Sequence, residues 1–288
     1  MAERLVAILN DCEAGRLPPN IALMRLLIEA GSREEAEAAI AQASASGGAR
    51  LDELARLFAA NPDAWTTTRA VMAEAEHDGA RENGVAHWAA VFDRLARRAP
   101  EAGVALYALG SPDLLKAATE EVVARMREWG LLGPDRSLLE IGCGIGRLSL
   151  ALAPEMASVT GLDVSGEMIA QARRRAAGVV NARFAQNSGR DLSDIRDGTV
   201  DVVLAADVFP YLVAAGEELA RRHIEEAARV LRPGGALLIL NYSYRGDLEA
   251  DRRDVGTLLA SASFAVGRDG TQDFALWDAS AYLGRKPR

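Results

Sequence analysis

The chain has 288 residues, of which 49% are hydrophobic and 26% are charged, the proportions of an ordinary globular protein. Its net charge of −8 argues against a nucleic-acid backbone as the main partner, because phosphate binding needs clustered positive charge. The local run Arg173-Arg174-Arg175 is interpreted as the solvated face of a helix.

The cysteines, histidines and apolar segments set further limits. Cys12 and Cys143 are too few for a disulfide framework, and the three histidines lie in unrelated places, so we expect no metal site. No uninterrupted apolar run approaches the ~20 residues that a membrane helix needs. The N-terminal segment mixes acidic and basic side chains, unlike a signal peptide. We therefore expect a cytoplasmic protein that binds neither membranes nor nucleic acid.

Residues 1–105 are rich in alanine and show only helical periodicity, which predicts an all-helical N-terminal domain. Asn20 is predicted to cap the second helix, and Ser32-Arg33-Glu34-Glu35 to open the third as a capping box. Such a domain could act as a lid, bind substrate or dock a partner. The predicted helices cover approximately residues 2–13, 20–30, 33–44, 51–58, 63–76 and 85–98.

Residues 106–288 form the second predicted domain, in which strands and helices alternate. Ser111 and Pro112 are typical of a helix start, and this helix is expected to end at Trp129. The alternation predicts an α/β fold with a Rossmann-like, doubly wound, mostly parallel seven-stranded sheet that ends in an antiparallel hairpin. The predicted strands cover residues 137–141, 158–163, 182–186, 200–205 and 236–241 and two more after 263; the helices between them cover 147–153, 166–177, 217–231 and 248–262.

A glycine-dense turn follows the first of these strands. Gly142, Gly144 and Gly146 precede a helix start, and such a turn lets a ligand approach the backbone where a Cβ would block it. Asp163 ends the next strand, where an acid can accept both hydroxyls of a ribose. A dinucleotide fingerprint would need a third glycine at Arg147, and the lysine of a phosphate-binding P-loop is absent. The turn therefore predicts a cradle for another nucleotide.

The stretch Glu140-Ile141-Gly142-Cys143-Gly144-Ile145-Gly146 resembles motif I of the class I S-adenosylmethionine-dependent methyltransferases. Asp163-Val164-Ser165-Gly166-Glu167-Met168 is similar to the second motif of that family. The resemblance implies that Asp163 binds the ribose hydroxyls and that Val164 and Met168 flank the adenine. Independently of the family, Ser165 is a plausible helix cap, and Glu167 would complement the helix dipole.

Three further segments agree with the family in order and spacing. Residues 187–192 resemble the loop that reads the adenine amino group, with Ser188 where the family usually has an acid. Residues 201–207 resemble its fourth strand, and residues 229–235 the turn into its fifth strand. The resemblance extends from about Tyr107 to the C-terminus and implies S-adenosylmethionine as cofactor. The implied cofactor residues are Glu140, Gly142, Cys143, Gly144, Gly146, Asp163, Val164, Met168, Ser188, Gly189, Asp207 and Val208.

The acceptor is expected at the carboxyl ends of the fourth and fifth strands, since ligands bind there in parallel sheets. Asp207 could border the cofactor or accept a proton, and tyrosines in the two following segments could line an acceptor pocket. His223 is predicted to face solvent. The candidate catalytic residues are Asp207, Tyr211 and Tyr242, and the candidate substrate residues are Tyr107, Tyr211, Tyr244 and Arg245.

These observations predict methyl transfer from S-adenosylmethionine to a small molecule, with O-methylation slightly favoured over N- or C-methylation. Asp207-Val208-Phe209-Pro210 does not match the motif of nucleic-acid amino-methyltransferases. Two alternatives stay open: a protein methyltransferase whose helical domain docks its target, and a non-catalytic regulatory protein that binds the cofactor. A homodimer is compatible with the sequence.

Overall fold

The computed structural model describes residues 2–45, 47–74 and 80–288, which divide into two compact units. The first unit comprises residues 1–76, 97–121 and 274–278, and the second comprises residues 77–96, 122–273 and 279–288. Each unit is described by itself below. Three separate stretches of the chain therefore build the first unit, including the short connection between the last two strands.

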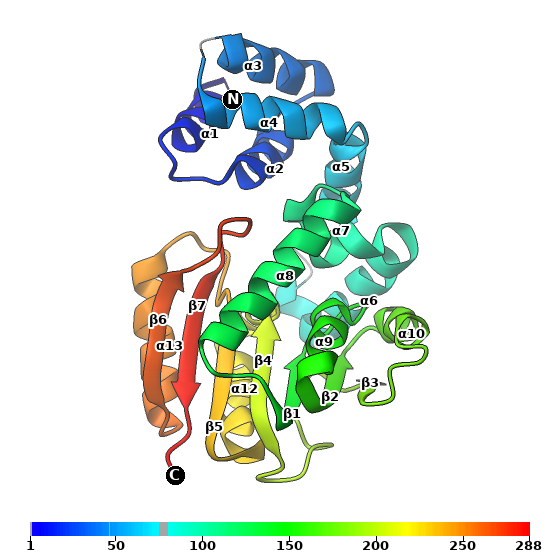
Figure 1. Ribbon diagram of the computed structural model, residues 1–288, viewed down its shortest axis with the longest axis vertical. Helices are drawn as coiled ribbons and strands as arrows, with labels where there is room; N and C mark the ends of the chain where they lie inside the picture. Colours follow the sequence, from blue (N-terminus) through cyan, green and yellow to red (C-terminus); the bar gives the residue numbers. More distant parts are fainter. Residues whose placement is uncertain (1, 46, 75–79) are drawn as a thin grey trace. The chain divides into compact units, whose positions relative to one another are not determined.

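The first unit is helical (Figure 1). Within the described part of residues 2–105 there is no strand, as predicted, and residues 75 and 76 of one predicted helix lie outside the described residues. Its helices are α1 (Ala2–Glu13), α2 (Pro19–Glu29), α3 (Arg33–Ala45), α4 (Ala49–Ala60), α5 (Ala64–Glu74) and α7 (Pro100–Val104), with the 3-10 turn η1 (Leu106–Ala108).

Asn20 does not cap α2, so that prediction is wrong. The helix begins at Pro19, whose fixed φ suits the first helical position, and Asn20 lies inside it with 1% of its surface exposed. Its amide Nδ2 donates to the carbonyl oxygens of Tyr107 (3.1 Å) and Leu276 (2.7 Å). The polar side chain therefore joins two distant segments of the unit. Tyr107 also stacks on Trp277, with 5.3 Å between the ring centroids.

The second unit contains one seven-stranded sheet in the order β3-β2-β1-β4-β5-β7-β6, which confirms the predicted fold class (Figure 1). Strands β1 to β5 are parallel, whereas β7 pairs antiparallel with both β5 and β6. The strands are β1 (Gly133–Ile141), β2 (Met156–Asp163), β3 (Ala182–Gln186), β4 (Val200–Ala206), β5 (Leu231–Leu240), β6 (Ala265–Gln272) and β7 (Ser280–Arg285).

Helices cover both faces of this sheet, and Figure 1 shows α12 and α13 behind it. The side chains between these two helices and the sheet form a buried cluster that includes Phe209, Ile224, Ile239 and Tyr282. The short helix α11 was not predicted. Two helices belong to both units: α6 (Ala80–Arg98) lies in this unit up to residue 96, and α8 (Pro112–Glu128) lies in it from residue 122. The other helices of this unit are α9 (Arg147–Leu152), α10 (Gly166–Arg175), α11 (Phe209–Ala215), α12 (Glu217–Val230) and α13 (Leu248–Ser261), with the 3-10 turn η2 (Ala153–Glu155).

His223 is buried, so the prediction that it faces solvent is wrong. Its side chain lies on α12 with 1% of the residue exposed, and its Nδ1 is 2.9 Å from the carbonyl oxygen of Leu219. The buried side of α12 includes Ala220, His223, Ile224 and Ala227, which recur at helical spacing, so His223 belongs to the face that packs against the core. Burial lowers the pKa of His223, which keeps the imidazole neutral at physiological pH.

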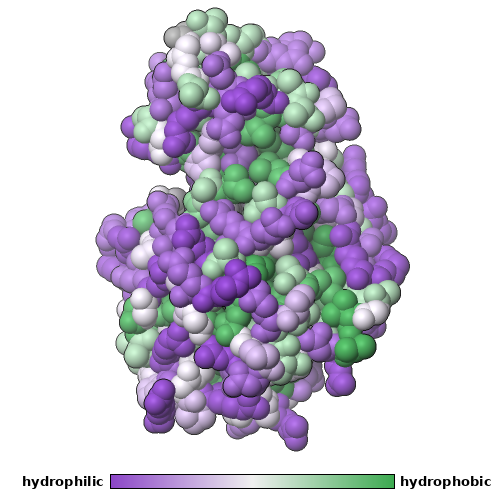
Figure 2. Space-filling model, viewed as in Figure 1, coloured by the Kyte–Doolittle hydropathy of each residue, from purple (hydrophilic) through white to green (hydrophobic). Residues whose placement is uncertain are grey.

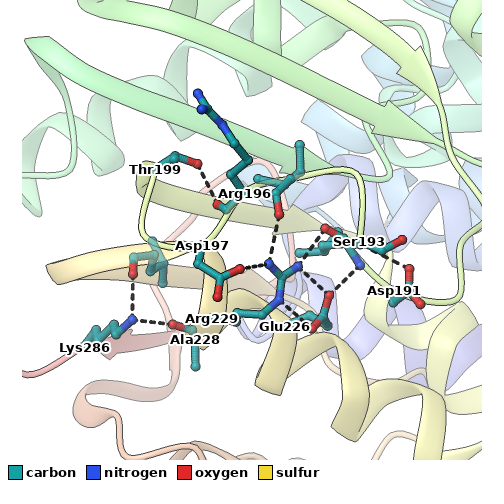
Figure 3. A network of polar contacts seen from close by, with 12 residues as sticks. Asp191, Ser193, Arg196, Asp197, Thr199, Glu226, Ala228, Arg229 and Lys286 are labelled. Carbon is teal, nitrogen blue, oxygen red and sulfur yellow. Dashed lines mark hydrogen bonds and ion pairs between the residues drawn. The ribbon is translucent and has the colours of Figure 1, made fainter.

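The edge of the sheet where its parallel strands begin, which we call the amino edge, is held by Arg229 of α12 (Figure 3). The Arg229 guanidinium donates to the Glu226 and Asp197 carboxylates and to the carbonyl oxygens of Leu192 and Ile195. Lys286 donates to the carbonyl oxygens of Ala228 and Leu231 at the end of α12. Every polar atom of the Arg229 side chain thus has a partner, as a structural clamp requires.

Among the described residues, no helix has the length and apolar character needed to cross a membrane. On the face drawn in Figure 2, apolar residues form scattered patches among charged and polar ones. The arginine run at residues 173–175 is exposed, as predicted for a solvated helix face.

Candidate active site

The candidate site lies at the opposite edge of the same sheet, where its parallel strands end, and we call this the carboxyl edge. It comprises residues 142–146, 163–168, 207–211 and 241–245, which lie at or directly after the ends of β1, β2, β4 and β5. Gly142, Gly144 and Gly146 have φ values of 68°, 52° and 79°, the left-handed conformation that favours glycine. A Cβ on Gly142 would lie 2.6 Å from Val208 Cγ2, and one on Gly146 would lie 2.9 Å from Phe184 Cζ. The turn therefore has no room for side chains at Gly142 and Gly146, because Val208 and Phe184 pack against their backbone.

Asp163 is fixed against this turn at the end of β2. Its carboxylate accepts hydrogen bonds from the backbone nitrogens of Gly144 and Ser165, both at 2.8 Å, and 8% of the residue is exposed. Burial raises the pKa of Asp163 to about 6, although the hydrogen bonds from Ser165 and Gly144 act in the opposite direction. Ser165 caps α10, as predicted, because its Oγ accepts from the backbone nitrogen of Met168. A mostly buried carboxylate thus lies beside the glycine backbone.

Glu140 and Cys143 lie beneath and within the turn. Glu140 is 3% exposed, and its carboxylate accepts a hydrogen bond from the Ser149 hydroxyl. Burial raises the pKa of Glu140 to about 7, and it raises that of Cys143 well above the ordinary value. Cys143 is therefore a buried thiol, and its raised pKa keeps it protonated at neutral pH.

The residues on the predicted adenine side of the cradle are closely packed. Met168 is fully buried, Val164 is half-buried, and Ser188 is exposed, with its Oγ accepting from the Arg190 nitrogen at 3.2 Å. Gly189 has a φ of 65°, and a Cβ there would lie 2.3 Å from Val164 Cγ1 and 2.6 Å from Val85 Cγ1. Gly189 and Val164, which were predicted to be neighbours of the adenine, therefore pack together, and Val85 of α6 joins them.

Asp207 and Asn241 follow neighbouring strands and share an unusual backbone. Their φ values are 54° and 64°, left-handed conformations that cost free energy for residues with a Cβ. Asn241 Nδ2 donates to Asp207 Oδ1 at 2.8 Å, and the Tyr244 hydroxyl donates to the same oxygen at 2.9 Å. Asn241 is held in turn by β7, since its Oδ1 accepts from the Ser280 nitrogen at 3.0 Å. The ends of β4 and β5 thus present one oriented carboxylate.

Aromatic side chains gather beside Asp207. Tyr211 makes edge-on contacts with Tyr244, Trp88 and Phe92, with centroid distances of 5.9, 4.7 and 5.0 Å. Burial and the Asp207 carboxylate raise the pKa of Tyr211 above its ordinary range, so its hydroxyl is protonated at neutral pH. Tyr211 can donate a hydrogen bond to a ligand but cannot serve there as a base.

The remaining candidates lie in other surroundings. Tyr242 is 4% exposed and packs on Phe209 in the core behind the sheet, where burial raises its pKa to about 12. Arg245 forms ion pairs of 2.7 Å with both Asp251 and Asp254 of α13. Tyr107 lies in the first compact unit and is 4% exposed.

The sequence interpretation missed the contribution of α6. Residues 85–96 belong to the same compact unit as the sheet and bring Val85, Trp88, Phe92 and Asp93 to the carboxyl edge. The spacing of Val85, Trp88 and Phe92 is that of one helix face and could have indicated a buried stripe. Nothing in that spacing indicates which surface the stripe covers. Within the described part of the chain, no group of three or more potential ligands could hold a metal ion.

Residues 139–239 match a protein-family model that is described as a methyltransferase domain. These residues form a class I S-adenosylmethionine-dependent methyltransferase domain. S-Adenosylmethionine is the methyl donor typical of this family, and the helical segments before residue 139 precede the matched region.

Curated relatives of this methyltransferase domain act on different acceptors according to their names. A 2-methyl-6-phytyl-1,4-hydroquinone methyltransferase from Synechocystis is 31% identical over 44% of this chain and 39% of its own length. A phosphatidylethanolamine N-methyltransferase from Cereibacter sphaeroides is 39% identical over 46% of this chain and 66% of its own length. A ubiquinone biosynthesis O-methyltransferase from Sodalis glossinidius is 32% identical over 38% of this chain and 41% of its own length. The chain thus spans less than two thirds of these relatives.

Two solved structures agree with the fold. A chain in the complex of the Haloferax volcanii Trm112 methyltransferase activator with its methyltransferase has a TM-score of 0.53 and 20% identity, and the match covers 68% of this chain and 98% of that one. Haemonchus contortus phosphoethanolamine N-methyltransferase 1 has a TM-score of 0.52 and 15% identity, over 69% of this chain and 48% of that one. At these identities the likeness concerns the fold of the methyltransferase domain.

Proposed function

We propose that this protein transfers a methyl group from S-adenosylmethionine to a hydroxyl group of a small molecule. The observation that carries the proposal is the pair Asp207 and Asn241. Two neighbouring strands end in left-handed residues that hold one carboxylate in place, and such backbone outliers concentrate at functional sites. The pair follows β4, which is next to the strand that leads into the glycine turn, and β5, which is next to β4, at the end of the sheet where ligands bind in parallel sheets.

The residues of the cradle fit the cofactor. The glycines of the turn at residues 142–146 adopt left-handed conformations and carry no Cβ, so their backbone could approach a ligand closely. Asp163 would accept the ribose hydroxyls, and Val164, Met168 and Gly189 would border the adenine. The buried acids Glu140 and Asp163 would favour a ligand that carries positive charge. S-Adenosylmethionine, when bound, supplies a methyl group that its sulfonium has already activated for displacement.

Asp207 would accept the proton that the acceptor hydroxyl loses as its oxygen bonds to the methyl carbon. Hydrogen bonds from Asn241 and Tyr244 hold the carboxylate in one orientation, which is what a general base needs. His223 cannot take this role, because it is buried in α12 against the core. Tyr211 and Tyr244 would line the acceptor pocket, and nearby apolar surface would exclude water.

A small acceptor is favoured by the aromatic side chains beside Asp207 and by the names of the relatives, which include a hydroquinone methyltransferase and a ubiquinone O-methyltransferase. Their acceptor classes suggest phenolic or quinol hydroxyls as the first compounds to test. We further propose that the N-terminal helical region, residues 1–105, serves as a lid or docks the acceptor, and that the protein acts in the cytoplasm.

The test is incubation of the whole protein with methyl-labelled S-adenosylmethionine and a metabolite extract. We expect label in small molecules, in the form of methyl ethers of phenols or alcohols. Label in large polypeptides would show a protein methyltransferase. Cofactor binding without turnover of any fraction would show a regulatory protein, and either result would overturn the proposal.

The role of Asp207 is tested with Asp207→Asn, which keeps the shape of the side chain. We expect kcat to fall about 100-fold while the Kd of S-adenosylmethionine stays within about threefold, because a general base contributes to the transfer step. Asp197→Asn is the matched control, since it neutralises an exposed acid at the amino edge just before β4. Unchanged kcat in Asp207→Asn would exclude Asp207 as the base.

A further inference from the structure

Residues 85–96 of one helix, α6, contact the carboxyl edge on both its proposed adenine side and its proposed acceptor side. Val85 packs at Gly189 and Val164 on the proposed adenine side. Trp88 and Phe92 make edge-on contacts with Tyr211 on the proposed acceptor side. Between these contacts, one acidic residue of α6 reaches the loop that presents Asp163.

That residue is Asp93. Its Oδ1 accepts a hydrogen bond from the Ser165 hydroxyl at 2.6 Å and another from the backbone nitrogen of Glu167 at 3.1 Å. The carboxylate therefore lies at the start of α10, where negative charge complements the helix dipole. Gln171 adds a second link between the two helices, since its Nε2 donates to the Ala96 carbonyl oxygen at 3.3 Å.

The bond from Ser165 to Asp93 fixes the direction of the Ser165 hydroxyl. With its proton directed to Asp93, the Ser165 oxygen accepts from the Met168 nitrogen at 3.0 Å. The Ser165 backbone nitrogen donates to Asp163 Oδ1 at 2.8 Å. A continuous chain of hydrogen bonds thus runs from α6 through Ser165 to the acid proposed to bind the ribose.

We propose that Asp93 is a positioning residue for cofactor binding: through Ser165 it sets the orientation of Asp163 and holds α6 against the cradle. This inference rests on the proposed function, since it concerns the same cofactor. The helix held by Asp93 also carries Trp88 and Phe92 to Tyr211. If cofactor binding orders α6, it would therefore also order the aromatic residues on the acceptor side.

The test compares Asp93→Ala, Asp93→Asn and Arg94→Gln, the last being an exposed control on the same helix. The Kd of S-adenosylmethionine is measured by calorimetry on the whole protein. We expect Asp93→Ala to raise Kd about tenfold, while Asp93→Asn, whose amide oxygen can accept both hydrogen bonds, stays within about threefold of wild type. Arg94→Gln should leave Kd unchanged.

A double-mutant cycle with Ser165→Ala separates positioning from a general loss of structure. We expect Asp93→Ala to add less than twofold to the Kd of Ser165→Ala, because both changes break the same chain. Fully multiplicative effects on Kd would overturn the inference. Hydrogen exchange of the peptide amides at residues 85–96 gives a second readout. S-Adenosylhomocysteine should slow exchange there in wild type and in Asp93→Asn but not in Asp93→Ala, and equal slowing in all three would also overturn it.

Asp163→Ala distinguishes the two proposals. If Asp163→Ala binds S-adenosylmethionine as wild type does, the proposed cofactor site is wrong. If Asp163→Ala loses binding while Asp93→Ala keeps the wild-type Kd, the cofactor site stands and the role of Asp93 is wrong.

Discussion

The two edges of the sheet use the same kinds of side chain in opposite ways. At the amino edge, the Arg229 hydrogen bonds hold the pKa of Glu226 below its ordinary value. Asp201 at the same edge is partly buried, yet hydrogen bonds from Ser137 and Arg232 outweigh burial and lower its pKa. At the carboxyl edge, burial raises the pKa values of Glu140 and Asp163 to about 7 and about 6.

This difference in pKa values indicates that the amino edge stabilises the fold and that the carboxyl edge is suited to bind a ligand. Acids paired with arginine are most stable when ionised, so the amino edge contributes to stability with no ligand present. At the carboxyl edge, burial outweighs the favourable interactions of Glu140 and Asp163, including the attraction of Glu140 to Arg147, so ionising these acids costs free energy. A positively charged ligand or a set of hydroxyl donors would offset that cost. The edge that is costly for the protein alone is therefore the edge suited to bind the cofactor.

The largest effect on stability is expected at the clamp. Arg229→Ala should lower the free energy of unfolding by about 3 kcal/mol, because it leaves the Glu226 carboxylate without its cation and two carbonyls without donors. Denaturant titration measures the loss. The folded variant should keep the wild-type Kd for S-adenosylmethionine, and a large change in Kd would mean that the two edges are not independent.

Glu140→Gln should act in the opposite direction. The folded-state pKa of Glu140, about 7, exceeds the ordinary value of 4.5, so its contribution is favourable at low pH and is lost as pH rises through 7. Glutamine keeps a hydrogen-bond partner for Ser149 and removes the buried charge. We expect a gain of about 2 kcal/mol at pH 8 and almost none at pH 5. Thermal unfolding at both pH values checks this, and equal gains would exclude the charge as the cause.

Cofactor binding should depend on pH through Asp163. The ionised carboxylate accepts the ribose hydroxyls, so affinity should be constant above about pH 7 and fall about tenfold per pH unit below about 6. The negative charges of Asp93 and Glu140 repel an ionised Asp163 and therefore also favour its protonated form. Calorimetry between pH 5 and 8 measures the profile. A flat profile in wild type would contradict the proposed role of Asp163.

The smallest effect is expected for Arg221→Ala, on the same helix as Arg229. Arg221 pairs with Glu218 and Glu225, but these side chains are exposed and screened by water. We expect no measurable change in the midpoint of thermal unfolding. A loss of stability as large as that expected for Arg229→Ala would show that the number of ion pairs, not their burial, decides how much they contribute to stability.

Local signals in the sequence predicted much of the fold and the cradle. The glycine spacing, the acid at the end of β2 and the cap at Ser165 are each encoded within a few residues, so the structure confirms the Ser165 cap and places Asp163 beside the glycine backbone. The expected alternation of strands and helices also matches the observed sheet. These features depend on short-range chemistry that a single sequence displays.

Features that depend on tertiary packing were not predicted. The burial of Tyr242 follows from Asn241: its left-handed backbone interrupts the alternation of β5, and Tyr242 joins the same buried cluster as Leu237 and Ile239. Arg245 pairs with acids on α13, which lie within ten residues of it along the chain. The contact of Asp93 with Ser165 joins residues 72 positions apart, and no local pattern indicates it.

The most direct test of the account is calorimetric titration of S-adenosylmethionine into wild type, Asp163→Ala and Asp201→Ala, two acids of one sheet at opposite edges. We expect wild type and Asp201→Ala to bind with similar Kd and Asp163→Ala to bind at least about 100-fold more weakly, a difference of about 2.7 kcal/mol. Equal binding by wild type and Asp163→Ala, or an equal loss in both variants, would contradict the assignment of the carboxyl edge as the cofactor site.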